Sequence, residues 1–254
     1  MEDKLYWYWL SAISGISCRK QHQLMKVFLH PKELFLTPSH IIEEKITRKI
    51  LPRFLESRKE DLIQKSYDAL EKQQIQFLLY NETEYPRRLK KIYDYPYGMF
   101  RKGQAWEEKA LTIAVVGTRK PTAYGMEVTK YLSRELTKLG VGIVSGLAKG
   151  IDGAAHRGAC SIQGSTVGIL GCGIDRIYPW DNYQLFYEMY ETQTVFSEYP
   201  PGTAPNPWRF PERNRIISGM SDGILVTEAE EKSGSLITAD LGLEQNKEIF
   251  AVPG

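Results

Sequence analysis

The chain has 254 residues, of which 42% are hydrophobic and 25% are charged, and its formal net charge is +2. These values are typical of an ordinary globular protein, and they exclude a disordered, collagen-like or disulfide-scaffold chain. A net charge so close to zero does not by itself indicate nucleic-acid binding, so an anion site would depend on where the cations lie. The length favours one large domain with a smaller one attached.

The sequence contains no apolar run of about 18 residues, and the short LYWYWL stretch near the start follows Glu2 and Asp3. Neither a membrane span nor a secretory signal is therefore expected. Three cysteines occur, Cys18, Cys160 and Cys172, without a CxxC pair, which favours a reducing compartment. We expect a cytoplasmic protein with no membrane contact.

The first part of the chain, residues 1–75, is predicted to be a small all-helical domain. Leu5, Trp9 and Ile13 recur at helical spacing, which is typical of a helix face packed in a core. The fragment Ser14-Gly15-Ile16-Ser17 resembles the turn of a DNA-binding helical hairpin, although an ordinary interhelical turn is the more common interpretation. Residues 76–110 are predicted to be an irregular connector with a short strand.

Residues 111–254 alternate between apolar runs and amphipathic stretches. The runs are LTIAVVG, VGIVSG, STVGIL, TQTVFSEY, GILVTEA and EIFAVPG. Continuous apolar runs indicate parallel strands that are covered on both faces. The predicted fold class is therefore α/β, with a doubly wound, mostly parallel, Rossmann-like sheet. In the first crossover helix, Val128, Leu132, Leu136 and Leu139 are expected to form the buried face, and Gly140 to end the helix.

Glycine, hydroxyl and basic residues follow several of these predicted strands, where an open parallel sheet binds its ligands. The residues are Gly117, Thr118, Arg119, Lys120, Ser145, Gly146, Lys149, Gly150, Gly171, Gly173, Asp175, Arg213, Asn214, Arg215, Ser233, Gly234, Ser235 and Thr238. Any one such turn requires glycine or serine for its backbone alone. Because several of them fall on the same edge, we expect a phosphate-type ligand there.

Motifs of common enzymes and cofactor sites are missing. A GxGxxG fingerprint after the first strand, a Walker A loop, a GxSxG elbow and an HExxH pair do not occur. Asp152, His156 and Cys160 share one helix face and could be metal ligands, but the more common interpretation is that Asp152 caps the helix and His156 packs. No catalytic residue, cofactor or metal is therefore predicted.

Several strings resemble the bacterial DNA-processing protein A (DprA, also called Smf) family. In chain order they are VVGTRKPTAYG, SGLAKGIDGAAHRGA, GILGCGIDRIYPWDN, SEYPPG, FPERNRIISGMSDGILVTEA, SGSLITA and FAVPG. The resemblance implies an extended Rossmann-like domain after a small SAM-like helical domain. It also implies a non-enzymatic homodimer that binds single-stranded DNA and presents it to the RecA recombinase in natural transformation.

Carried over by position, the resemblance implies that Arg119 contacts a DNA phosphate. It also places Tyr178 and Asn182 in the binding loop that contains Gly171, Gly173 and Asp175. Trp180 departs from the family, because a basic residue is common there, although an indole could stack on a base. The chain also ends at Gly254, where family members add a further strand–helix segment, so a truncated or unusually short member is expected.

Aromatic and basic residues are interleaved near the predicted site. Tyr178, Trp180, Trp208 and Phe210 lie close in sequence to Arg176, Arg209 and Arg213. Such interleaving suits unpaired bases, so a preference for single strands over duplex is expected, unless the aromatic side chains pack as core. The alternative function is a nucleotide-binding enzyme or sensor related to the phosphoribohydrolases, whose PGGxGTxxE motif is replaced here by SGSLITAD.

Overall fold

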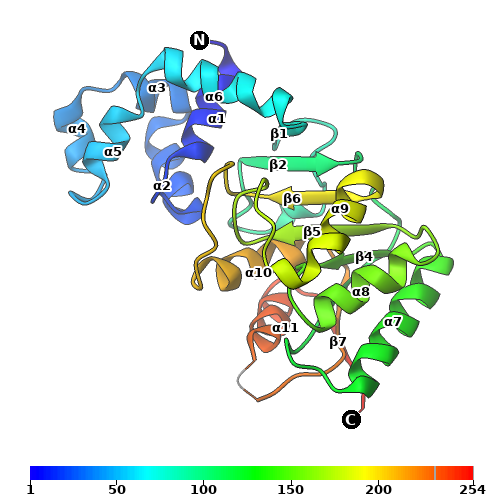
Figure 1. Cartoon of the computed structure of the whole chain (residues 1–254). Coiled ribbons are helices and arrows are strands. Elements are labelled where there is room, and N and C mark those ends of the chain that lie inside the picture. Colours follow the sequence, from blue (N-terminus) through cyan, green and yellow to red (C-terminus); the bar gives the residue numbers. More distant parts are fainter. Residues whose placement is uncertain (232, 254) are drawn as a thin grey trace.

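The computed structural model describes residues 1–231 and 233–253. Its centre is a sheet of 8 strands in the order β1-β2-β6-β5-β4-β3-β7-β8 (Figure 1). The pairs from β6 to β8 are all parallel, whereas β1 and β2 join the sheet antiparallel. The strands are β1 (Ile75–Leu79), β2 (Gly98–Gly103), β3 (Thr112–Val116), β4 (Gly142–Ser145), β5 (Thr166–Leu170), β6 (Thr194–Ser197), β7 (Gly223–Val226) and β8 (Glu248–Ala251).

The α/β fold with a mostly parallel sheet is confirmed, and each predicted apolar run contains a strand. The last run ends at Gly254, which lies outside the described residues. Alternate residues of β3 enter different cores, because Ile113 and Val115 pack with α8, whereas Ala114 and Val116 pack with α10. The sheet is therefore covered on both faces. The covering helices are α7 (Ala123–Lys138), α8 (Ile151–Cys160), α9 (Tyr183–Thr192), α10 (Arg209–Gly219) and α11 (Gly234–Glu244).

The segment before β1 is helical, and it lies at the antiparallel end of the sheet (Figure 1). Leu5, Trp9 and Ile13 are buried, so this stripe is core as expected. They belong to one continuous apolar cluster with Phe77 of β1 and Phe100 of β2. The helices are α1 (Asp3–Ala12), α2 (Cys18–Phe28), α3 (Pro31–Leu36), α4 (Ser39–Glu43), α5 (Leu51–Glu56) and α6 (Glu60–Lys72).

The connector contains more regular structure than predicted. Instead of one short strand it supplies β2 and most of β1, which pair with each other, and β2 also pairs with β6. Short 3-10 helices, η1 (Leu89–Lys91) and η2 (Trp180–Asn182), complete the elements. The division at residues 1–75, 76–110 and 111–254 stays a prediction.

The buried face of α7 differs from the prediction. Its buried positions are Gly125, Thr129, Ser133 and Thr137. Of the predicted residues, Leu132 and Leu136 are partly buried against the core, whereas Leu139 is 80% exposed. Small residues fit there because other segments come close: Gly125 faces Glu228, Thr129 hydrogen-bonds Thr227, and Thr137 lies against Gly164. The helix also packs closely against α8, where a Cβ on Gly158 would lie 2.4 Å from the backbone oxygen of Lys130. Gly140, with φ +81°, follows the last residues of the helix, as expected for its stop.

Within residues 1–231 and 233–253, no helix is both long and apolar enough to cross a bilayer.

Candidate nucleic-acid interface

The predicted residues gather at one edge of the sheet. The chain leaves β3, steps outward through β4, β5 and β6, and then returns to place β7 on the other side of β3. Ligands of open α/β sheets bind at such a switch point, beyond the carboxyl ends of the strands. We use the name strand-end rim for the loops that follow β3, β4, β5 and β6, residues 117–122, 146–150, 171–182 and 198–208.

Glycine at position 150 lets the first two loops of the rim touch. Gly150 has φ +83°, and a Cβ there would lie 2.4 Å from the backbone oxygen of Thr118. The backbone N–H of Ile151 donates to that same oxygen over 3.2 Å, and the N–H of Thr118 donates to the backbone oxygen of Glu228 over 2.7 Å. An L-amino acid is disfavoured at this positive φ, and its Cβ would clash with the Thr118 oxygen. The turn therefore requires glycine.

Arg213 lies underneath the rim and does not face solvent. Its side chain is buried, and the guanidinium donates to the backbone oxygens of Gly146, over 2.8 Å, and of Ile169. The buried Asp152 carboxylate accepts from the N–H of Gly146 over 3.1 Å. Burial raises the pKa of Asp152, while the charge of Arg213 acts to lower it. Arg213 therefore ties the loop after β4 to the end of β5 from below.

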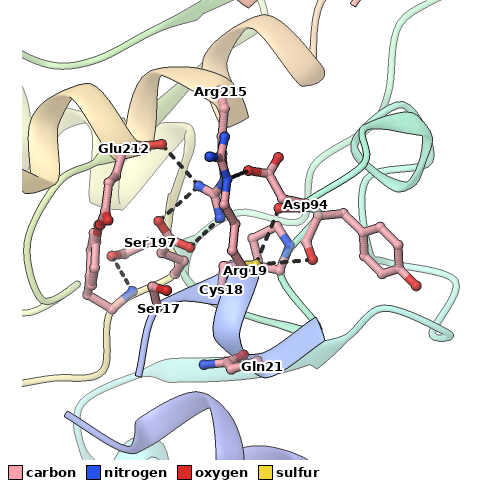
Figure 2. A network of polar contacts seen from close by, with 12 residues as sticks. Ser17, Cys18, Arg19, Gln21, Asp94, Ser197, Glu212 and Arg215 are labelled. Carbon is pink, nitrogen blue, oxygen red and sulfur yellow. Dashed lines mark hydrogen bonds and ion pairs between the residues drawn. The ribbon is translucent and has the colours of Figure 1, made fainter. Parts of the chain in front are cut away.

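Arg215 is also buried, in a network that reaches the connector and the helical segment (Figure 2). Its Nη1 and Nη2 donate to the two carboxylate oxygens of Glu198 over 3.0 and 2.7 Å. Its Nε lies 3.4 Å from the Asp94 carboxylate, which also accepts from Nε of Arg19 over 3.1 Å. Any effect that Arg213 or Arg215 has on a ligand at the rim acts through the loops that they hold.

Two more of the predicted residues fasten loops to each other. Asn182 is buried, and its amide donates to the backbone oxygens of Leu147 and Ala148 over 3.1 and 2.9 Å. Asp175 accepts from the N–H of Gly202 over 2.8 Å, which joins the loop after β5 to the loop after β6. These side chains give the rim a fixed shape before any ligand binds.

The SGSLIT stretch forms the start of α11. Ser235 and Thr238 are buried, and the hydroxyls of Ser233 and Ser235 are 2.6 Å apart. The Asn214 amide donates to the backbone oxygen of Gly234 over 3.2 Å, which ties α10 to α11. Gly234 itself is exposed, with open space where a Cβ would be.

Four basic side chains of the rim are exposed, Arg119, Lys120, Lys149 and Arg176, and Arg176 lies 3.7 Å from the Asp175 carboxylate. In the described part of the chain, no carboxylate lies within ion-pair distance of Arg119 or Lys120. Lys149 pairs with Asp181 at 3.0 Å, and this hydrogen bond lowers the pKa of the Asp181 carboxyl. The guanidinium carbon of Arg119 lies 5.5 Å from the ring centre of Phe210. Arg119 and Lys120 are thus available to an anionic ligand.

The same loops carry exposed aromatic rings. Trp180 is 67% exposed and Trp208 is 54% exposed, so neither packs as core. The Tyr178 ring lies 5.4 Å from the Phe210 ring at 30°, and Trp180 lies 5.4 Å from Tyr183 at 15°. Faces of this kind can stack on unpaired bases.

Tyr183 was not among the predicted site residues, and Phe210 was predicted only as one of the aromatic residues near the site. Phe210 lies over Gly171, where a Cβ would be 2.7 Å from its ring, so glycine at 171 makes room for it. The FPERNR string that contains Phe210 was a usable signal, whereas nothing in the sequence around Tyr183 pointed to its stack with Trp180.

The Asp152, His156 and Cys160 face is part of the core. His156 is fully buried, and its Nδ1 hydrogen-bonds the Thr166 hydroxyl at 2.8 Å, which agrees with the interpretation that it packs. Asp152 supports the loop at Gly146, whereas the N-cap of α8 is Gly150. Within the described residues, no group of three or more potential ligands could hold a metal ion.

His156 should make the protein sensitive to acid. Burial, helped by the charge of Arg157, lowers the pKa of His156 to about 3. Since the unfolded chain takes up this proton near pH 6.5, the free energy of unfolding should fall as the pH drops from there toward about 3. Between pH 6.5 and 5 the fall due to this group is about 2 kcal/mol. Urea unfolding of wild type and His156→Gln at pH 7 and 5 measures it, and an equal fall in both proteins would contradict it.

Comparisons with known proteins give a consistent result. The family model described as DNA recombination-mediator protein A matches residues 76–254. The chain is 47% identical to DNA processing protein DprA of Bacillus subtilis over 187 residues, which is 73% of this chain and 63% of that protein. It is 42% identical to protein Smf of Escherichia coli over 171 residues, 67% of this chain and 46% of that protein. The chain therefore spans less than two thirds of the length of these curated relatives.

Solved structures agree with the sequence comparisons. The crystal structure of DprA from Streptococcus pneumoniae matches with a TM-score of 0.84 and 32% identity, covering 100% of this chain and 88% of that one. A structure of DprA from Helicobacter pylori matches with a TM-score of 0.66 and 32% identity, covering 71% of this chain and 81% of that one. The latter was described for its single-stranded DNA binding mode.

Proposed function

The chain belongs to the DNA recombination-mediator protein A (DprA) family, and from this premise we propose that it binds single-stranded DNA along the strand-end rim. The observation that carries the proposal is the exposure of Arg119 and Lys120, which have no ion-pair partner among the described residues. Arg119 lies over the Phe210 ring, which the exposed Tyr178 ring also contacts. Cations attract the phosphates of any nucleic acid, whereas free aromatic faces favour unpaired bases.

The proposed partners of the protein are based on its family membership alone. As a recombination mediator, the protein would present the bound strand to the RecA recombinase and act as a homodimer. The predicted cytoplasmic location suits this role, and the three cysteines are free thiols. The rim residues that contact DNA directly would be the exposed ones. The buried Arg213, Arg215 and Asn182, together with the half-buried Asp175, would keep the loops in place.

Stacking of DNA bases on Trp180 or Trp208 should make the protein bind single-stranded DNA more tightly than duplex DNA. We expect at least one of Trp180→Ala and Trp208→Ala to weaken binding of oligothymidine by about 1–3 kcal/mol, because base–aromatic stacking contributes that much per base. Duplex of equal length should be bound more weakly by the wild type. Fluorescence anisotropy with labelled oligonucleotides measures both.

Tyr131→Ala is the matched control, because Tyr131 is 56% exposed on α7 and lies outside the rim. If both tryptophan variants and their double variant retain the wild-type affinity and strand preference, recognition depends on the backbone alone. The alternative function has its own readout: release of free base from purine nucleoside monophosphates would identify a nucleotide-cleaving enzyme.

A further inference from the structure

A pocket of about 470 Å³ lies between the helical segment and the sheet domain, next to the strand-end rim. One wall is the turn between α1 and α2, which includes Ser14 and Ser17. The opposite wall is the loop before α10 together with Ile237 and Leu241 of α11. The volume is within the range of about 300–1,000 Å³ that is typical of small-ligand sites. None of the predicted functions used this pocket.

The pocket wall carries three basic and three acidic side chains, Arg19, Arg209 and Arg215 against Asp94, Glu198 and Glu212. Arg215 pairs with both Glu198 and Asp94, and Arg19 shares the Asp94 carboxylate (Figure 2). Glu212 accepts a hydrogen bond from the Tyr199 hydroxyl over 3.2 Å. Burial, together with the charge of Glu198, raises the pKa of Glu212. A wall of paired charges offers little attraction to a phosphate, and it suits a neutral ligand that has hydrogen-bonding edges.

The mouth of the pocket suits a flat group. Trp208 lines the pocket and is 54% exposed, and the guanidinium carbon of Arg209 lies 4.6 Å from its ring centre. Ile237, which is 41% exposed, adds an apolar surface on α11. An aromatic face beside aliphatic side chains, with polar groups deeper inside, is the usual setting for a planar heterocycle.

The pocket and the rim share a short stretch of chain at the start of α10. Phe210 faces the rim, where it contacts Tyr178 and Arg119. The residues on either side of it, Arg209 and Pro211, line the pocket. The rim and the pocket are thus adjacent along the chain, and a single strand lying on the rim passes close to the mouth of the pocket.

We propose that this pocket receives one unpaired base of the strand whose backbone lies on the rim. The inference rests on the proposed function and makes it more specific, because it names a neutral nucleobase as the ligand of a second subsite formed jointly by the helical segment and the sheet domain. The helical segment then takes part directly in DNA binding, through the turn that contains Ser14.

The test combines two changes. Tryptophan substitutions fill the pocket, and abasic sites remove single bases from the oligonucleotide. Ile237→Trp adds bulk from α11, and Ser14→Trp adds it from the opposite wall, with both positions exposed enough to accept the change. Leu243→Trp is the matched control, since Leu243 is 61% exposed on the same helix and does not line the pocket. Each protein is titrated with oligothymidine that carries a single abasic site at successive positions, and thermal unfolding verifies that each variant is folded.

In the wild type, the abasic site should weaken binding by about five- to 150-fold at one position more than at its neighbours. Both pocket-filling variants should bind intact oligothymidine with the affinity that the wild type has for that abasic strand, and they should lose the penalty at that position. Leu243→Trp should retain it. If the filled variants keep wild-type affinity and the same abasic profile, no base enters the pocket, while binding at the rim stands. If the wild type does not bind oligothymidine, the proposed function fails first.

Discussion

Replacing Arg215 with alanine should lower the free energy of unfolding by about 3–5 kcal/mol, the cost of breaking a buried ion pair. The change leaves the Glu198 carboxylate, 11% exposed, without its guanidinium partner, and it leaves Asp94 paired only with the exposed Arg19. Urea unfolding at neutral pH, followed by circular dichroism, measures the loss. The double variant Arg215→Ala, Glu198→Gln should recover part of the lost free energy of unfolding, because the second change removes the unpaired Glu198 charge.

The control is an exposed ion pair of similar length. Arg134 lies 3.0 Å from Glu135 near the end of α7, with 43% of its side chain exposed. Arg134→Ala should change the free energy of unfolding by less than about 1 kcal/mol. Equal losses from Arg215→Ala and Arg134→Ala would contradict the structural role of Arg215.

Removing the Arg119 side chain should have the largest effect on DNA binding. A hydrogen bond to a charged group contributes about 1.5–3 kcal/mol, so Arg119→Ala should raise the Kd for oligothymidine roughly ten- to hundred-fold. The loss should be the same for any base sequence, since the contact is to phosphate. Arg119 has no carboxylate partner within the described residues, so its removal leaves no buried charge behind.

Arg134→Ala also serves as the control for this measurement. Arg134 lies near the C-terminal end of α7, and this helix starts at the strand-end rim and runs away from it. Its removal deletes the same charge from the chain without touching the rim. If the two variants bind oligothymidine equally, net charge and not the rim determines affinity.

Much of the sheet could be predicted because its strands are buried on both faces. Runs such as Ile113 to Val116 are continuously apolar, and this signal needs no knowledge of the partners. The loops were recognisable for a similar reason, since Gly150 occupies a backbone conformation that other residues avoid. Constraints of this kind depend on residues that are adjacent in the sequence, so the sequence alone reveals them.

Features that depend on distant residues were not predictable. Gly125 and Thr129 are buried on α7 because they face Glu228 and Thr227 after β7, contacts that the leucine spacing could not indicate. The sequence predicted Arg213 and Arg215 to be phosphate ligands. In the structure, Arg213 binds the loop after β4 and the end of β5, and Arg215 binds Asp94 of the connector. The pocket beside Trp208 requires the turn at Ser14, almost the whole chain away.

The salt dependence of oligothymidine binding tests the central claim most directly. If exposed cations of the rim neutralise DNA phosphates, binding must release counterions, so the logarithm of the affinity should fall linearly with the logarithm of the salt concentration, by about 0.7 per phosphate contacted. Measured between about 50 and 200 mM salt, the wild-type Kd should rise steeply, and the slope for Arg119→Ala should be smaller by about 1. A Kd that stays constant across this range would contradict a phosphate-binding rim.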